Sequence, residues 1–185
     1  YDGSIQLIKH GDDFFSDMFM SQYKDNVIEM PEWLEEQIRY PQELFNWRTE
    51  MYNIYHVTDV DIFIQANEFY EIPRGLDTYY IQAKPPGFEE PEFIGLLSLE
   101  LRGSQGRNLA GYMVVENDKP NLGHMQFYEV PIESDIKLLG PTSVREALDR
   151  DPDFAQLKTL LRNPRIGDNI LYQVGEHDTY FIPVY

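Results

Sequence analysis

His56 and two nearby aspartates have the residue types of a proton-transfer site. His56 lies three residues before Asp59 and five before Asp61. A histidine oriented by a carboxylate can act as a general base near neutral pH. A histidine at the end of an aromatic helical segment can instead satisfy the last carbonyl groups of that helix. The sequence favours the structural interpretation, because residues 57–59 are predicted to end one helix and cap the next.

Acidic side chains offer the oxygen ligands that calcium and magnesium prefer. Asp59 and Asp61 form one group, and Asp12, Asp13 and Asp17 form another. The chain lacks a glycine-containing calcium loop, and the acidic triplet at positions 149, 151 and 153 lacks the later glycine and glutamate of such a loop. The aspartates stand where helix caps and first-turn acids are expected. We therefore expect neither a metal site nor a cofactor.

Arg39 and Tyr40 form a further candidate binding position at the junction of two predicted helices. They precede Pro41, which interrupts the helical pattern. Arg39 is expected to pair with Glu43 or to cap the first helix, and a binding role would need a buried charged partner to hold it in place. The structural role is the favoured interpretation.

Catalytic motifs are absent from the sequence. A Gly-x-Ser-x-Gly elbow, a phosphate-binding loop and a dinucleotide-binding glycine pattern are all missing. Glycoside hydrolysis needs two carboxylates a few ångströms apart, and 32 acidic residues supply such pairs by chance alone. Aromatic side chains can stack on sugars but more often build cores and interfaces. A hydrolase acting on cell-envelope sugar or peptide through acidic residues therefore stays an alternative.

The charge of the chain limits its partners. The 185 residues include 32 acidic and 15 basic side chains, which give a net charge of −17. This charge repels phosphate backbones and anionic lipids, so nucleic acid is not an expected partner. It suits solubility, divalent cations or a basic protein, and strongly acidic surfaces also occur in proteins from salty cytoplasm. No cysteine is present, which excludes disulfides and thiolate chemistry.

The hydrophobic pattern predicts a single α+β domain over residues 1–185. Residues 1–75 are mainly helical after an opening strand, with helices expected at 12–20, 31–40, 41–55 and 60–66. Residues 76–185 are mainly strands, with a helix at 142–161 that begins at a Thr142 cap. We expect an antiparallel sheet of about five to seven strands. The strands are expected at 78–84, 93–101, 109–116 and 124–130, and in a hairpin of 169–174 and 179–184 around a turn at 175–178.

Several segments together resemble an uncharacterised family of large multi-pass membrane proteins of bacteria and archaea. The most telling part is the stretch Arg39-Tyr40-Pro41-Gln42-Glu43-Leu44-Phe45, followed by Tyr55-His56-Val57-Thr58-Asp59. The resemblance also covers residues 1–4, 30–38, 71–73, 140–141 and 182–185, in the same order along nearly the whole chain. It departs after position 73, where the loop is short, and at the turn Gly167-Asp168-Asn169.

The resemblance implies a parent protein in the cell membrane, with a block of transmembrane helices and a large extracytoplasmic region. This chain would be a late part of that region. It lacks about 18 consecutive uncharged apolar residues, so it is not expected to span a bilayer itself. The start at Tyr1 without a methionine favours a fragment.

The family has no assigned activity to carry over. We expect a non-catalytic binding or assembly module whose partner is the remainder of the parent or another envelope protein. The alternatives are the envelope hydrolase and a ligand or metal sensor. The candidate binding residues are His56, Asp59, Asp61, Arg39 and Tyr40.

Overall fold

The computed structural model describes all residues except 1, 36, 104–106, 131–137, 163 and 175–176. Its contacts divide the chain into two compact units, Tyr1–Arg39 and Tyr40–Tyr185. Each unit has its own elements, and we describe them separately. Among the described residues, no helix is both long enough and apolar enough to cross a membrane.

The N-terminal unit contains short elements. A two-residue strand β1 (Leu7–Ile8) pairs in parallel with β2 (Val27–Ile28). Between them lie helix α1 (Phe14–Gln22) and a 3₁₀ turn (Lys24–Asn26). Asp13 caps α1 by accepting hydrogen bonds from the backbone N–H groups of Phe15 and Ser16.

The helix expected at residues 31–40 is much shorter than predicted. Helix α2 comprises only Glu32–Glu35. Pro41 disfavours the helical conformation at Tyr40. The backbone N–H of Tyr40 donates a hydrogen bond to Oδ1 of Asn117 at 2.7 Å. This tertiary contact and the proline together keep Tyr40 out of a helix.

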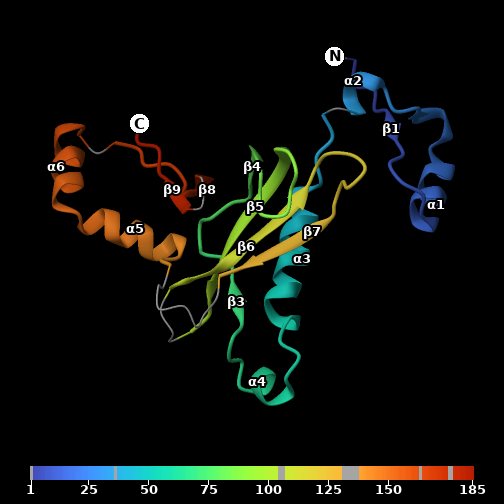
Figure 1. The fold of residues 1–185 in the computed structure, drawn as a ribbon. Helices are drawn as coiled ribbons and strands as arrows, with labels where there is room; N and C mark the ends of the chain where they lie inside the picture. The colour runs from blue at the N-terminus through green and yellow to red at the C-terminus, as the bar shows by residue number, and fades with distance from the viewer. Residues whose placement is uncertain (1, 36, 104–106, 131–137, 163, 175–176) are drawn as a thin grey trace. The chain divides into compact units, whose positions relative to one another are not determined.

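The second unit is built on a five-stranded antiparallel sheet, which confirms the predicted α+β class (Figure 1). The main path runs β3 (Tyr70–Glu71), β5 (Glu92–Leu101), β6 (Leu109–Glu116) and β7 (Met125–Glu129). Strand β4 (Tyr79–Ala83) pairs with the first half of β5, and β3 pairs with its end. The register of β5 and β6 shifts after Leu99, where a β-bulge leaves Ala110 as the extra residue.

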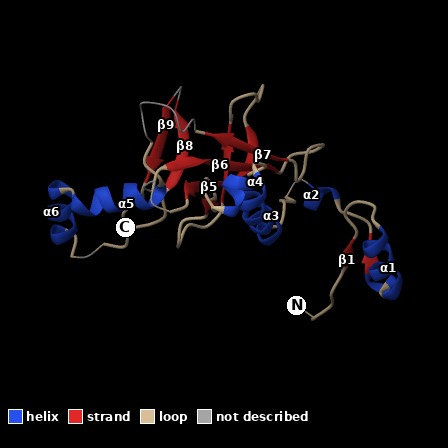
Figure 2. Cartoon of the chain, turned by 90° about the horizontal axis from the view of Figure 1, so that it is seen from below, coloured by secondary structure: helices blue, strands red, loops and turns tan. Residues whose placement is uncertain are grey.

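The central strands are buried on both faces, so each face has its own cover (Figures 1 and 2). Leu97, Met113 and Val115 pack with Phe45 of helix α3 (Gln42–Tyr55). The alternate residues of β5 and β6 pack with Leu171 on the other face. Leu171 belongs to a hairpin of β8 (Ile170–Val174) and β9 (His177–Phe181), and positions 175 and 176 of its predicted turn lie outside the described residues.

The remaining helices follow the turn and cap signals of the sequence, with one exception. Helix α4 (Val60–Ile64) is short, as predicted. The region 142–161 forms two helices, α5 (Pro141–Arg150) and α6 (Pro152–Leu160), joined at Asp151. The predicted Thr142 cap is wrong: Gly140 is the cap residue and Pro141 begins the helix. The side chain that bonds the free N–H comes instead from Glu100 on β5.

Candidate functional site

His56 ends α3 and points back into its own helix. Its Nδ1 donates to the carbonyl oxygen of Tyr52 at 2.8 Å. Its ring stacks on Tyr70, with ring centroids 4.0 Å apart, and on Tyr52 at 5.2 Å. This geometry is that of a helix C-terminal histidine held between aromatic rings. It fixes the end of α3 against strand β3.

Asp59 and Asp61 serve the start of α4. Oδ1 of Asp59 accepts hydrogen bonds from the backbone N–H groups of Asp61 and Ile62, at 2.9 and 3.0 Å. Asp61 is exposed in the first helical turn. The carboxylate that could orient His56 is thus engaged with the backbone of the next helix. Within the described part of the chain, no group of three or more acidic or histidine side chains is placed to hold a metal ion.

Tyr40 is held by contacts to three other segments of its unit. Its carbonyl oxygen accepts from the hydroxyl of Tyr80 at 3.1 Å, and its own hydroxyl accepts from Nη1 of Arg48 at 3.1 Å. The same Arg48 nitrogen donates to the carbonyl of Gly123 at 3.0 Å. These bonds fasten the start of α3 to the sheet. Arg39 is exposed and ends the N-terminal unit.

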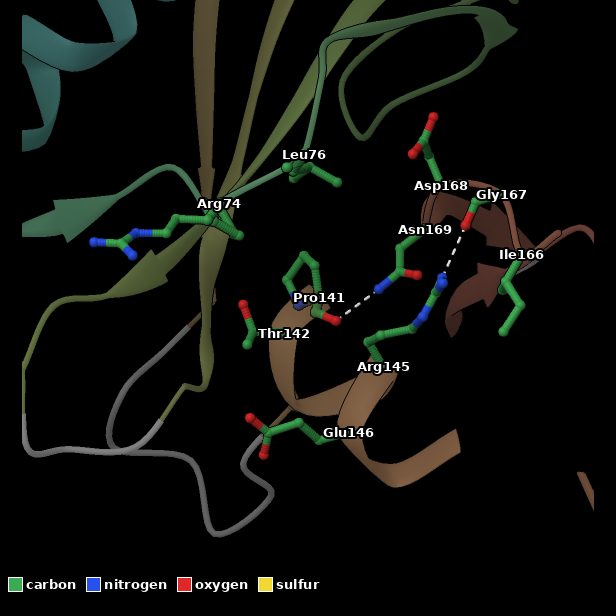
Figure 3. A pocket seen from close by; sticks show the side chains of 12 residues that line it. Arg74, Leu76, Pro141, Thr142, Arg145, Glu146, Ile166, Gly167, Asp168 and Asn169 are labelled. Carbon is green, nitrogen blue, oxygen red and sulfur yellow. Dashed lines mark hydrogen bonds between the residues drawn. The ribbon is translucent and has the colours of Figure 1, made fainter. Parts of the chain in front are cut away.

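A cavity of about 330 Å³ lies at the first turn of α5 (Figure 3). Its walls are joined by two hydrogen bonds, which Figure 3 marks with dashed lines. Nδ2 of Asn169 donates to the carbonyl of Pro141 at 2.6 Å, and Nη1 of Arg145 donates to the carbonyl of Gly167 at 2.9 Å. Both polar side chains are therefore committed to holding residues 166–169 against α5.

An adjoining cavity of about 580 Å³ contains two carboxylates that lie opposite each other in the sheet. Glu71 and Glu100 are register partners on β3 and β5. Glu100 is only 1% exposed. Its Oε1 accepts from the backbone N–H of Thr142 at 2.6 Å, and its Oε2 accepts from the Thr142 hydroxyl at 2.9 Å. Glu100 thus caps α5 from a distant strand, which a local sequence signal cannot reveal.

Burial raises the pKa of Glu100 above the ordinary value of 4.5, and the nearby charge of Glu71 acts in the same direction. The Glu100 carboxyl group therefore holds its proton more tightly in the folded state than in the unfolded state. The free energy of unfolding should fall as pH rises from the unfolded pKa through the folded one.

Glu100→Gln should remove this pH dependence, because an amide can accept from the Thr142 N–H and donate to its hydroxyl. Urea unfolding from about pH 5 to pH 8 should show the variant gaining stability relative to the wild type as pH rises. Glu90→Gln, in an exposed loop, is the matched control, and its free energy of unfolding should differ from that of the wild type by the same amount at every pH. A difference for Glu100→Gln that does not change with pH would contradict the effect of Glu100 on stability.

The outer face of α3 carries an apolar stripe. Trp47, Met51 and Tyr55 are 61%, 62% and 68% exposed, and Leu44 lies on the same side of the helix. Tyr55 stacks on Phe63 of α4 with ring centroids 6.2 Å apart, so the stripe continues onto that helix. We name this the α3–α4 surface, and its members are Leu44, Trp47, Met51, Tyr55, Val60 and Ile64.

Helix α3 carries apolar side chains on two faces. Phe45 and Tyr52 pack on the sheet, whereas Leu44, Met51 and Tyr55 are exposed. Adjacent apolar residues differ by about 100° around a helix, so the pairs at 44–45 and 51–52 supply both faces. Trp47 is not among the candidate residues found from the sequence, and the signal for it is the spacing 44, 47, 51, 55.

Comparison with known proteins places the chain in a family. The model of an uncharacterised protein family, UPF0182, matches residues 1–161. The chain belongs to UPF0182. This membership confirms the resemblance seen in the sequence, and no solved structure matches the chain.

Curated UPF0182 proteins that match the chain are much longer than it. The chain is 32% identical to a UPF0182 protein of Sulfurovum sp. over 84% of its length, which is 18% of that relative. It is 30% identical to one from Methanospirillum hungatei over 92% of its length, which is 20% of the relative. For Salinibacter ruber the identity is 29%, over 84% of the chain and 17% of the relative. The chain thus spans about a fifth of the UPF0182 proteins it matches.

Proposed function

We propose that this chain is a non-catalytic assembly module in the extracytoplasmic region of a membrane protein. Its α3–α4 surface docks on another part of the same polypeptide. The observation that carries the proposal is the exposure of Trp47, Met51 and Tyr55 along one face of a well-packed helix. The membrane and extracytoplasmic parts of the proposal rest on the sequence resemblance.

The α3–α4 surface has the composition of a protein interface. Tryptophan, tyrosine and methionine are enriched at interface cores, and Trp and Tyr carry much of the binding energy there. An exposed apolar patch of this kind on a folded unit marks a place where another surface packs. Glu43 and Glu50 are exposed on the flank of the stripe. The partner surface should therefore be apolar at its centre and basic at its rim.

The length of the relatives supports a partner within the same polypeptide. About four-fifths of each matched UPF0182 protein lies outside the part that aligns with this chain. A segment of the same polypeptide is present at high effective concentration, so a modest patch suffices for stable docking. A second copy of this chain would bring a second charge of −17, which opposes self-association.

The hydrolase alternative has one observation in its favour. It requires a cavity with two converging carboxylates, at least one with a shifted pKa, and Glu71 with Glu100 meets that description. Both oxygens of Glu100, however, accept hydrogen bonds from Thr142. This carboxylate already has a structural task at the start of α5, so we favour the assembly role.

The test is photo-crosslinking in the full-length membrane protein. A photoreactive aromatic amino acid at position 47 should form crosslinks to segments of the same polypeptide outside residues 1–185. The same probe at Glu90, in an exposed loop, should give few or none. Crosslinks from position 47 only to a second copy, only to another protein, or at the level of the Glu90 control would contradict the proposal. Turnover of a defined substrate by the chain, abolished by changing one acidic or histidine side chain, would also overturn it.

A further inference from the structure

The described part of the N-terminal unit exposes seven of its large apolar side chains and fully buries none of the others. Neither α1 nor α2 contains a buried residue. The members of the core clusters among the described residues all come from position 40 onward. In the N-terminal unit the exposed large apolar side chains are Ile5, Phe14, Phe15, Met18, Phe19, Tyr23 and Trp33.

Helix α1 gathers four of these side chains on one side. Phe14, Met18, Phe15 and Phe19 span an arc of about 140°, at a rotation of about 100° per residue. Phe14 and Phe15 are each 73% exposed. The arc has the width and the spacing of a helix face that packs on another surface. We name it the α1 face.

A small number of polar contacts help to hold the N-terminal unit together. Lys9 pairs with Asp12 and Asp17 at 2.6 Å each, with both carboxylates largely exposed. Nδ2 of Asn26 donates to the carbonyl of Ile5 at 2.9 Å, beside the two-residue pair of β1 and β2. Exposed ion pairs stabilise little, and a nine-residue helix is marginal without tertiary packing. Such a unit needs an apolar surface from elsewhere.

We infer that the α1 face packs against a basic-rimmed apolar surface in the part of the longer polypeptide that lies beyond this chain. The inference extends the proposed assembly role to a second, separate surface. The length of the relatives supports this partner, because about four-fifths of each relative lies outside the part that aligns with this chain.

The charge of the unit favours this partner over a second copy of the chain and over an anionic lipid surface. Residues 1–39 contain nine acidic and three basic side chains. A second copy would repeat that negative charge, and an anionic lipid surface would be repelled by it. The net negative charge of residues 1–39 matches a rim of lysine or arginine.

Limited proteolysis of the full-length protein tests the inference. In the wild type, cleavage within residues 1–39 should be slow, and Phe15→Ser/Phe19→Ser should accelerate it by about tenfold or more as the segment is released. Gln22→Ser, at an exposed position of the same unit, should leave the rate unchanged. In the isolated chain of residues 1–185 the segment should be cleaved quickly with or without the double substitution, because α1 contains no fully buried residue.

Three results would overturn the inference. The first is an unchanged cleavage rate for the double variant in the full-length protein. The second is equally fast cleavage of the wild-type segment in the isolated and full-length proteins. The third is a photo-crosslink from position 19 that maps to a second copy or to residues 40–185. Because the probe at position 47 reports on the α3–α4 surface separately, either proposal can fail while the other stands.

Discussion

Replacing Phe45 with alanine should lower the free energy of unfolding of the chain by about 3–5 kcal/mol. Phe45 is 0% exposed and packs with Leu97, Met113 and Val115 at the contact between α3 and the sheet. The loss combines the transfer of a large ring with the cavity that remains in a close-packed layer. Urea unfolding followed by circular dichroism would measure it from the shift of the midpoint.

Trp47→Ala is the matched control for this prediction. Trp47 lies on the same helix, two residues further on, and faces away from the sheet. Its loss should change the free energy of unfolding by no more than about 0.5 kcal/mol. A loss comparable to that of Phe45→Ala would mean that Trp47 packs within the chain and would remove the basis of the α3–α4 surface.

Gly111→Ala should be similarly damaging, with a loss of about 3 kcal/mol or more. A β-carbon at Gly111 would lie 2.2 Å from the carbonyl oxygen of Tyr128 and 2.7 Å from Cζ of Phe127. Tyr128 and Phe127 belong to the adjoining strand β7, and a backbone oxygen cannot rotate aside as a side chain can. Strands β6 and β7 would have to separate locally. The same urea titration measures the loss.

Gly95→Ala provides the comparison on the neighbouring strand β5. Its new β-carbon would lie 2.9 Å from Cγ1 of Val115 and 3.0 Å from Cε1 of Tyr80, both side-chain atoms. Small shifts of these side chains should limit the loss to about 1 kcal/mol. Equal losses in the free energy of unfolding at the two glycines would contradict the close approach of β7 to Gly111.

The fold class could be predicted because its signals are local. Periodicity and turn residues located α3, α4 and strands β4, β5, β6 and β7 within a few residues, but not the two-residue strand β3. The non-helical conformation of Tyr40 and the cap of α5 could not be predicted in the same way. Both depend on partners far along the chain, Asn117 for Tyr40 and Glu100 for Thr142. Side-chain contacts between distant segments leave no periodic trace in one sequence.

The candidate residues show a similar division. The positions of His56 and Asp59 next to helix ends suggested capping roles. In the structure His56 bonds the carbonyl oxygen of Tyr52, and Asp59 accepts from a backbone N–H of α4. The outward orientation of Trp47 was not predicted, because a helix with apolar residues on two sides gives no single hydrophobic direction. The side of α3 that packs on the sheet depends on the strands that contact Phe45.

The bulge at Ala110 constrains how the length of this strand pair can change during evolution. It lets Ala110 share a core cluster with Leu99 on one face while Leu109 joins the cluster on the other. Deleting one residue from a regularly paired part of either strand would exchange the two faces for every position beyond the deletion, since side chains alternate along a strand. Insertions and deletions between β5 and β6 should therefore fall in the connecting loop and spare the paired segments.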